Sequence, residues 1–148
     1  MDPTPITDPS NSFDDLIVTS NLKSGIYIVT LNNDQPISVN ANDPRIADKV
    51  IKVTKKNCKI GKAKDLADRR KNYFKVFGER NVNFRPVVKM LEIDAAEKAI
   101  LAHLDQYRIR GITGRKNEWL QNIESSELLR IVLNALSELG LPFEQVEW

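Results

Sequence analysis

Cysteine and histidine are nearly absent from this chain, which has one of each, Cys58 and His103. A single cysteine excludes an internal disulfide framework and fits a reducing compartment. The pair also excludes a zinc site made by the Cys and His of this chain alone. No apolar run approaches the ~20 residues of a membrane-spanning helix, and no basic segment followed by an apolar stretch marks a secretory signal at the N-terminus. We therefore expect a cytoplasmic protein with no membrane partner.

Net charge is also small, at +2, but it is unevenly distributed along the sequence. Residues 49–75 carry a net charge of +9, whereas residues 1–48 and residues 118–148 each carry −5. A basic centre between acidic ends is the electrostatic footprint expected of a protein that binds a nucleic-acid backbone. The alternative from charge alone is a solvated, lysine-rich surface.

Apolar periodicity and turn residues predict an α+β fold. The first 20 residues are rich in Asp, Pro, Ser and Thr, which indicates a flexible acidic tail. The patterns predict strands over 26–31 and 84–91 and a short strand over 50–53 that leads toward Cys58-Lys59-Ile60. They also predict helices over 66–76, over 94–107 and from Ser125 or Ser126 to Leu139. We expect a small three-stranded antiparallel sheet flanked by about three helices. The rest of the chain, 21–148, would then form a single domain.

Two motifs carry the clearest functional signal. One is Gly25-Ile26-Tyr27 at the start of a predicted strand, and the other is Lys59-Ile60-Gly61-Lys62-Ala63-Lys64-Asp65-Leu66-Ala67-Asp68-Arg69, followed by Tyr73-Phe74. This arrangement resembles the GIY-YIG nuclease family, in particular its excision-repair-like and phage-type endonuclease domains. Two departures stand out: Lys59 replaces the family's second tyrosine, and it lies thirty-two positions after Tyr27. The extra residues, about 35–56, would form a segment inserted between the first two strands, and we refer to them as the inserted segment.

The resemblance implies a catalytic role for five residues: Tyr27, Lys59, Arg69, Tyr73 and Glu97. Tyr27 and Tyr73 would position or activate the attacking water, with core packing as the alternative for each. Lys59 would serve as a general base only if burial or neighbouring positive charge lowered its pKa, and otherwise it is an exposed strand lysine. Arg69 would hold the phosphate through its planar guanidinium, or else form a local ion pair with Asp65.

Glu97 is the expected metal ligand. It falls inside the apolar face of its predicted helix, where a carboxylate is costly unless it is paired or metal-bound. The alternative is a capping box, Asp94-Ala95-Ala96-Glu97. One glutamate with waters and substrate phosphate suits Mg²⁺, for which Mn²⁺ can substitute.

Further residues would support the site or contact nucleic acid. Gly61 would allow close backbone approach, Lys62 matches a motif lysine, and Glu118 in Glu118-Trp119-Leu120 would support the metal or orient a catalytic residue, or else be a surface residue. The expected nucleic-acid contacts are basic residues of the motif and of the predicted loop over 110–117: Lys62, Lys64, Arg70, Lys71, Arg115 and Lys116.

The resemblance therefore predicts a small metal-dependent endonuclease that hydrolyses DNA phosphodiester bonds. We expect double-stranded DNA as the favoured substrate, a monomer or homodimer, and a bacterial or phage-infected cell as the setting. The alternative is a catalytically inactive domain of the same fold that binds DNA, or a protein-interaction adaptor in a phage or defence system. The departure at Lys59 motivates this alternative.

Overall fold

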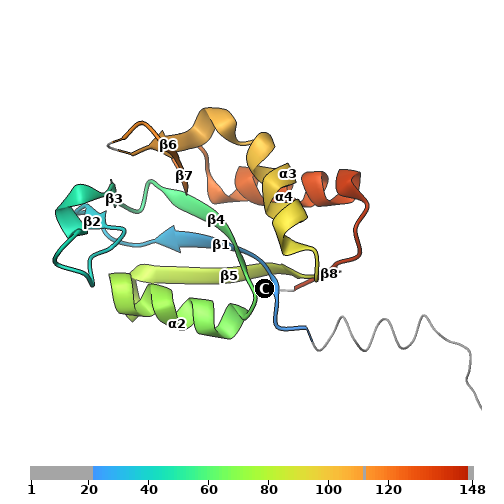
Figure 1. Cartoon of the computed structure of the whole chain (residues 1–148), viewed down its shortest axis with the longest axis horizontal. Helices are drawn as coiled ribbons and strands as arrows, with labels where there is room; N and C mark the ends of the chain where they lie inside the picture. Colours follow the sequence, from blue (N-terminus) through green and yellow to red (C-terminus); the bar gives the residue numbers. More distant parts are fainter. Residues whose placement is uncertain (1–21, 112, 147–148) are drawn as a thin grey trace, which may run out of the picture.

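The computed structural model describes residues 22–111 and 113–146, so the predicted acidic tail lies outside the described residues. Two sheets and three α-helices make up this part of the chain (Figure 1). The larger sheet has six antiparallel strands, in the order β6 (Arg108–Arg110), β7 (Lys116–Leu120), β4 (Cys58–Ala63), β1 (Gly25–Leu31), β5 (Val82–Lys89) and β8 (Glu144–Gln145). The helices are α2 (Leu66–Phe77), α3 (Ile93–Ala102) and α4 (Ser125–Leu139).

The prediction of a small three-stranded sheet was wrong, because three further strands extend it to six. The predicted loop over 110–117 is instead largely a hairpin of β6 and β7, and β7 pairs with the outer edge of β4. On the other side, β8 pairs with β5. All three strands are short: β7 and β8 pair with backbone groups of β4 and β5 that a three-stranded sheet would leave unpaired, and β6 extends the sheet beyond β7.

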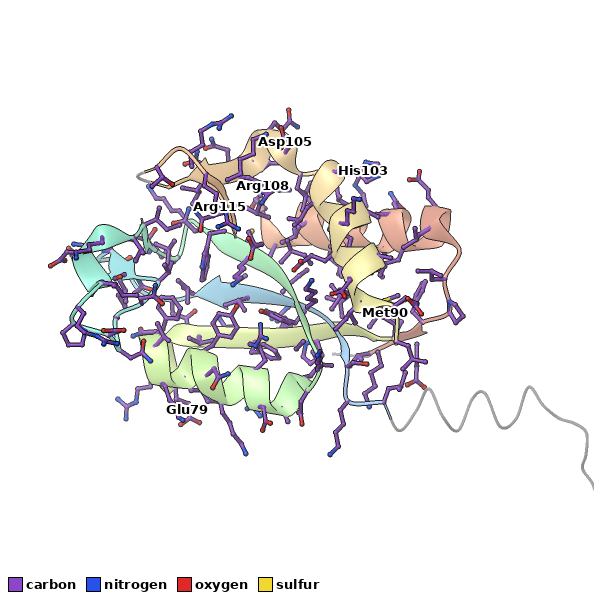
Figure 2. The ribbon with its side chains drawn as sticks, in the orientation of Figure 1. Glu79, Met90, His103, Asp105, Arg108 and Arg115 are labelled. Atoms are coloured by element: carbon purple, nitrogen blue, oxygen red, sulfur yellow. The ribbon has the colours of Figure 1, made fainter. Side chains whose placement is uncertain are left out.

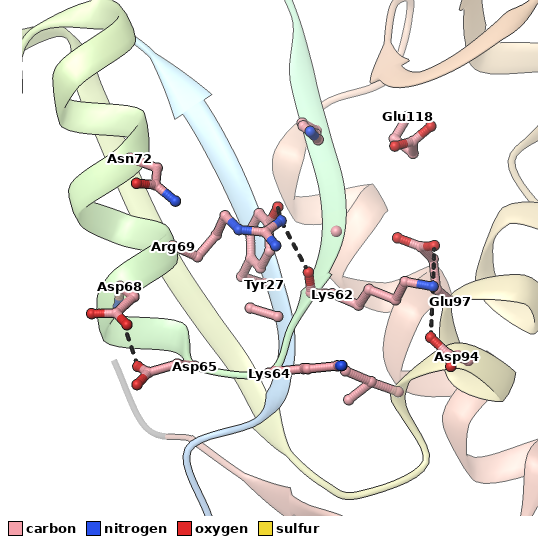
Figure 3. A pocket seen from close by; sticks show the side chains of 14 residues that line it. Tyr27, Lys62, Lys64, Asp65, Asp68, Arg69, Asn72, Asp94, Glu97 and Glu118 are labelled. Carbon is pink, nitrogen blue, oxygen red and sulfur yellow. Dashed lines mark hydrogen bonds and ion pairs between the residues drawn. The ribbon is translucent and has the colours of Figure 1, made fainter.

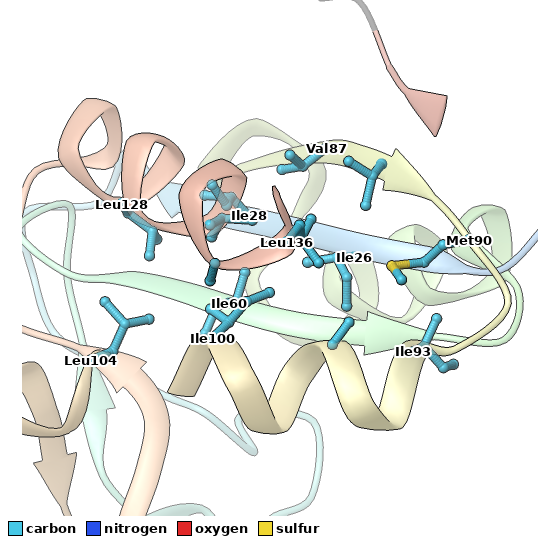
Figure 4. Packing of buried hydrophobic residues seen from close by; sticks show 14 of the residues in the cluster. Ile26, Ile28, Ile60, Val87, Met90, Ile93, Ile100, Leu104, Leu128 and Leu136 are labelled. Atoms are coloured by element: carbon cyan, nitrogen blue, oxygen red, sulfur yellow. The ribbon is translucent and has the colours of Figure 1, made fainter. Parts of the chain in front are cut away.

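The strand β1 is buried on both faces of the sheet, and its alternating side chains separate two cores. Ile26 and Ile28 pack with α3 and α4, a cluster that Figure 4 shows from close by. Tyr27 and Val29 point to the other face, against α2. The alternation that predicted this strand therefore also divides the molecule into two layers, one on each face of the sheet.

The ends of α2 follow the sequence prediction closely. Asp65 is the N-cap, and its carboxylate accepts a hydrogen bond of 3.2 Å from the backbone N–H of Asp68. Gly78 ends the helix with φ of 87°, a left-handed value that favours glycine, and its N–H donates to the Phe74 carbonyl. Because both ends are fixed, the residues between them face the sheet in a defined register.

Residues 35–56, the predicted insertion, form a small sheet of β2 (Ile37–Ser38) and β3 (Lys52–Val53), with the 3₁₀ turn η1 (Ala47–Lys49) between them. Two more 3₁₀ turns follow in the chain, η2 (Glu79–Asn81) and η3 (Asp105–Tyr107). The predicted helix over 94–107 is wrong at its C-terminal end, because α3 stops at Ala102 and η3 follows. No helix among the described residues has the length and apolar character needed to cross a bilayer.

Candidate functional site

An open cleft of about 390 Å³ lies at the edge of β4, between α2 and α3. The strand β7 pairs with β4 only at Cys58 and Lys59, so it does not cover the rest of this edge. Because α2 and α3 pack on opposite faces of the sheet, both helices can reach the cleft past this uncovered edge (Figure 1). Seven of the eight residues expected in the catalytic site line it: Tyr27, Lys59, Gly61, Lys62, Arg69, Glu97 and Glu118 (Figure 3).

Tyr27 and Gly61 face each other across β1 and β4. The tyrosine ring lies over the glycine so closely that a Cβ at position 61 would stand 2.3 Å from the hydroxyl oxygen. A glycine is therefore required here, as the motif predicted. The side chain of Tyr27 is buried, with 0% exposed surface.

A hydrogen-bond network joins Tyr27, Tyr73 and Arg69. The two tyrosine hydroxyls lie 2.7 Å apart, and Nη1 of Arg69 donates to Oη of Tyr27 at 3.2 Å. Burial raises the pKa of Tyr27 and also that of Tyr73, so both hydroxyls are neutral at ordinary pH. Tyr73 lies beneath the cleft, and lines a second, adjoining cleft instead.

Arg69 points into the cleft rather than along its own helix (Figure 3). Its Nη1 atom donates to Tyr27 and, at 3.2 Å, to the backbone carbonyl of Lys62. The alternative of a local ion pair with Asp65 is therefore not what the geometry shows, since Asp65 instead caps the helix. The guanidinium is held by two neutral oxygen atoms, which leaves its positive charge available to an anion.

Lys59 lies at the far end of the cleft, above two aromatic rings. Its ammonium is 5.3 Å from the ring centroid of Tyr73 and 5.9 Å from that of Trp119. Desolvation by burial lowers the pKa of Lys59, the charge of Glu118 opposes this effect, and that of Arg69 adds to it. The direction is the one that a lysine general base requires.

Glu97 and Lys62 also line the cleft, on its α3 side. The Lys62 ammonium lies 2.7 Å from Asp94 Oδ1 and 3.4 Å from Glu97 Oε1. Hydrogen bonding between Lys62 and Asp94 raises the pKa of the lysine and lowers that of the aspartate. The capping-box alternative for Glu97 was wrong, because α3 begins at Ile93, Glu92 is its N-cap, and no side chain caps it.

The side chains that could bind a divalent ion in the cleft suit some ions and not others. No group of three or more His, Cys, Asp and Glu side chains that could hold a metal occurs in the described ranges, which argues against a zinc-like cage. Glu97 presents one carboxylate, 17% exposed, to an open cleft. Mg²⁺ commonly keeps several waters and binds through one or two carboxylates plus substrate phosphate, so Glu97 fits it.

The residues expected to contact nucleic acid are spread over three places. Lys62 and Lys64 line the cleft. Arg70 stacks on Phe74, with 5.0 Å between its guanidinium carbon and the ring centroid, and it lines a different pocket, while Lys71 is exposed on α2. Arg115 is exposed in the β6–β7 hairpin, at the same end of the molecule as Arg108 and Asp105 (Figure 2).

Lys116, also in this hairpin, is less available, because its ammonium pairs with Asp105.

Several cleft residues had not been singled out from the sequence. Asn72, Asp68 and Asp65 reach it from the α2 side, and Asp94 from α3. Asn72 had a usable signal, since it lies three residues after Arg69 and therefore on the same helix face. Asp94 had been considered only as a helix cap, and its pairing with Lys62 joins residues far apart in sequence.

Comparison with known proteins gives one family. A family model described as the T5orf172 domain matches residues 26–136, which include every residue of the cleft and both motifs except Gly25. This family is often associated with nuclease-like domains of the GIY-YIG and HNH types, although the model of the GIY-YIG family itself does not match. No curated protein and no solved structure matches the chain.

Proposed function

Because the chain belongs to the T5orf172 domain family, we propose that it is a metal-dependent endonuclease that hydrolyses DNA phosphodiester bonds. One observation carries the proposal: a guanidinium, an ammonium, a tyrosine hydroxyl and a carboxylate from four separate elements meet in one cleft. Hydrolysis of a phosphodiester needs charge neutralisation at the phosphate and a positioned water, and these groups supply both.

Arg69 binds the phosphate in this proposal. Its present partners are a hydroxyl and a backbone carbonyl, each 3.2 Å from Nη1. Charge-assisted bonds to phosphate are shorter and about twice as strong as bonds between neutral groups. The guanidinium therefore gains by binding two phosphate oxygens through its Nε and Nη2 donors, while its Nη1 atom keeps the hydrogen bond to Tyr27.

Tyr27 and Lys59 prepare the water. The raised pKa of Tyr27 keeps its hydroxyl neutral, which suits a group that orients a water by hydrogen bonding. The lowered pKa of Lys59 favours the neutral amine, the form that accepts a proton from water. Tyr73 shares a hydrogen bond with Tyr27 and stacks beneath the lysine, so it is a positioning residue for both.

Glu97 holds the divalent ion, together with waters and the bound phosphate. A bound Mg²⁺ would neutralise charge on the phosphate oxygens and lower the pKa of a coordinated water. The Lys62 ammonium lies 3.4 Å from Oε1 of Glu97, so it must turn away when an ion binds that oxygen, either toward Asp94 or toward the phosphate. The contact with Asp94, at 2.7 Å, is already formed.

A second function, DNA binding without cleavage, has its own support. The hydroxyl of Tyr27 is buried beneath Arg69, and the ammonium of Lys62 pairs with the one carboxylate assigned to the metal. Such a domain keeps the positive cleft but has no free position for water and ion. It would bind DNA with a steep salt dependence, without needing a metal and without cutting. An adaptor that binds protein would instead show negligible affinity for DNA.

The test is incubation of supercoiled plasmid with the protein and Mg²⁺ or Mn²⁺, beside an EDTA control. The variants are Arg69→Ala and Glu97→Ala, matched by Arg80→Ala and Glu79→Ala, which both lie in η2 and outside the cleft. Metal-dependent nicking or linearisation that is lost in the first pair and kept in the second is expected. Absence of cutting by the native chain, or cutting that survives both active-cleft substitutions, would overturn the proposal.

A further inference from the structure

A second cleft of about 220 Å³ adjoins the first. The two share Lys59, Arg69 and Asn72, so a single extended ligand can occupy both. The second cleft is smaller than the roughly 300–1,000 Å³ typical of drug-sized pockets. Its size suits one small planar group attached to whatever is bound at Arg69.

Aromatic side chains form the floor of this cleft. Tyr73, Phe77 and Trp119 line it and are almost fully buried. The rings of Phe77 and Trp119 meet edge to face, with centroids 5.7 Å apart, and those of Tyr73 and Phe77 stack at 6.4 Å. The Lys59 ammonium also lies over the rings of Tyr73 and Trp119 in this cleft. A nucleobase that enters the cleft would contact the aromatic floor beside this lysine, through its own aromatic face.

Three amide side chains surround the floor: Asn40, Asn72 and Asn117. They come from the inserted segment, from α2 and from β7. Each amide offers both a donor and an acceptor. Asparagine can form two hydrogen bonds with adenine, at N6 and N7.

The inserted segment is held in place at this rim. Ser38 is 7% exposed, and its hydroxyl donates to the Ala47 carbonyl at 2.5 Å while accepting from the Asn40 N–H at 3.2 Å. The backbone of Val39 donates to Ile51 at 3.1 Å. On the opposite side, the Asn117 carbonyl accepts from Arg108 Nε at 2.7 Å. Two of the amides are therefore presented by ordered backbone.

We propose that the second cleft is a nucleobase subsite, in which Asn40 and Asn117 read an adenine next to the phosphate bound at Arg69. This inference rests on the proposed function of the first cleft, because it takes DNA as the ligand. It assigns a purpose to the segment over 35–56, which supplies one wall of the subsite. Asn72, which lines both clefts, lies where the sugar joins base to phosphate.

The binding test uses Trp119 as a reporter. The chain has two tryptophans, and a Trp148→Phe background leaves Trp119 as the only one. In EDTA, the protein is titrated with single-stranded deoxyadenosine, thymidine and cytidine octamers and with an abasic octamer. We expect the adenine octamer to change Trp119 fluorescence and to bind about tenfold more tightly than the abasic one.

Asn40→Leu and Asn117→Leu keep roughly the side-chain size and remove the amide donor and acceptor without adding a charge. Each should bind the adenine octamer no better than the abasic one, while its affinity for the abasic octamer stays within about twofold of the native value. Asn83→Leu, on β5 and outside both clefts, is the matched control. Thermal melts confirm that all variants fold.

Four outcomes would overturn the subsite. They are equal binding of all octamers, an unchanged Trp119 signal, an unaltered preference for adenine in both variants, and no binding of any octamer. Cleavage of plasmid is measured separately. A chain that prefers adenine but never cuts would refute the endonuclease and keep the subsite, whereas a chain that cuts without base preference would do the reverse.

Discussion

The hydroxyl of Tyr27 lies over the α-carbon of Gly61, on the neighbouring strand, so closely that no other side chain fits between them. The two residues are register partners in β1 and β4. A Cβ at position 61 would stand 2.3 Å from the hydroxyl oxygen and 2.4 Å from the ring carbon that bears it. The glycine thus lets the ring cross β4 and present its hydroxyl to Arg69, 3.2 Å away.

Gly61→Ala should therefore damage both stability and activity. The added methyl must push the buried Tyr27 ring aside, and overpacking of this kind costs about 1–3 kcal/mol. Gly111→Ala is the matched control, because a Cβ there meets Asn117 at 3.4 Å and Arg115 at 3.6 Å. The midpoint of urea unfolding measures the stability of each of the two variants. Equal midpoints for the native chain and Gly61→Ala would contradict the packing described here.

Cys58 should be chemically silent in the folded protein. Its side chain is 2% exposed, and burial raises the pKa of its thiol to about 11. Because the thiolate is the reactive form, a chromogenic disulfide reagent at pH 8 should label native protein far more slowly than protein unfolded in urea. Labelling within seconds under native conditions would show that the edge of the sheet at β4 and β7 opens readily.

Lys59→Met should stabilise the protein while abolishing its activity. Burial lowers the pKa of Lys59, so the folded state binds this proton less tightly than the unfolded chain does. The resulting penalty is complete below the folded-state pKa and disappears as pH rises above the ordinary value of 10.5. Methionine removes the charge, and gains of about 0.5–2 kcal/mol are common for such replacements at functional sites.

The pH dependence separates this explanation from simple repacking. Melting temperatures of the native chain and Lys59→Met should differ most near pH 7 and converge as the pH rises above 10.5. Lys64→Met, at an exposed position of the same cleft, should show no such gain. A stability difference that is constant across this pH range would refute the charge penalty.

Local signals in the sequence predicted the centre of the fold but not its edges. Alternation over 26–31 and the cap at Asp65 each fix an element through neighbouring residues, and the structure has β1 and α2 there. The strands β6, β7 and β8 are short and mixed in composition. They form because β4 and β5 offer unpaired edges, and this cause lies far away in the sequence.

The residues of the candidate site were likewise predictable where they depend on local sequence, and not where they depend on the packing of distant elements. The motif spacing brought Tyr27, Gly61 and Arg69 to notice, since all three depend on one strand pair and the helix that follows it. The ion pair between Lys62 and Asp94 depends on how α3 packs beside β4, which no local pattern reveals. The start of α3 was not predictable from local sequence either, and a helix beginning at Ile93 removes the capping-box alternative for Glu97.

Lys62→Met should tighten the binding of a divalent ion at Glu97 and yet weaken cleavage. The Lys62 ammonium is 3.4 Å from Glu97 Oε1, so it competes with any cation for that carboxylate. Removing it should lower the Kd for Mn²⁺ in calorimetry by roughly tenfold. Cleavage should fall, because Lys62 also neutralises the phosphate. Lys64→Met, in the same cleft, should leave the Mn²⁺ affinity unchanged, and Glu97→Gln should abolish binding in either background. Equal Mn²⁺ affinity in the native chain and Lys62→Met would mean that the ion is held elsewhere, and the assignment of Glu97 as its ligand would then fail.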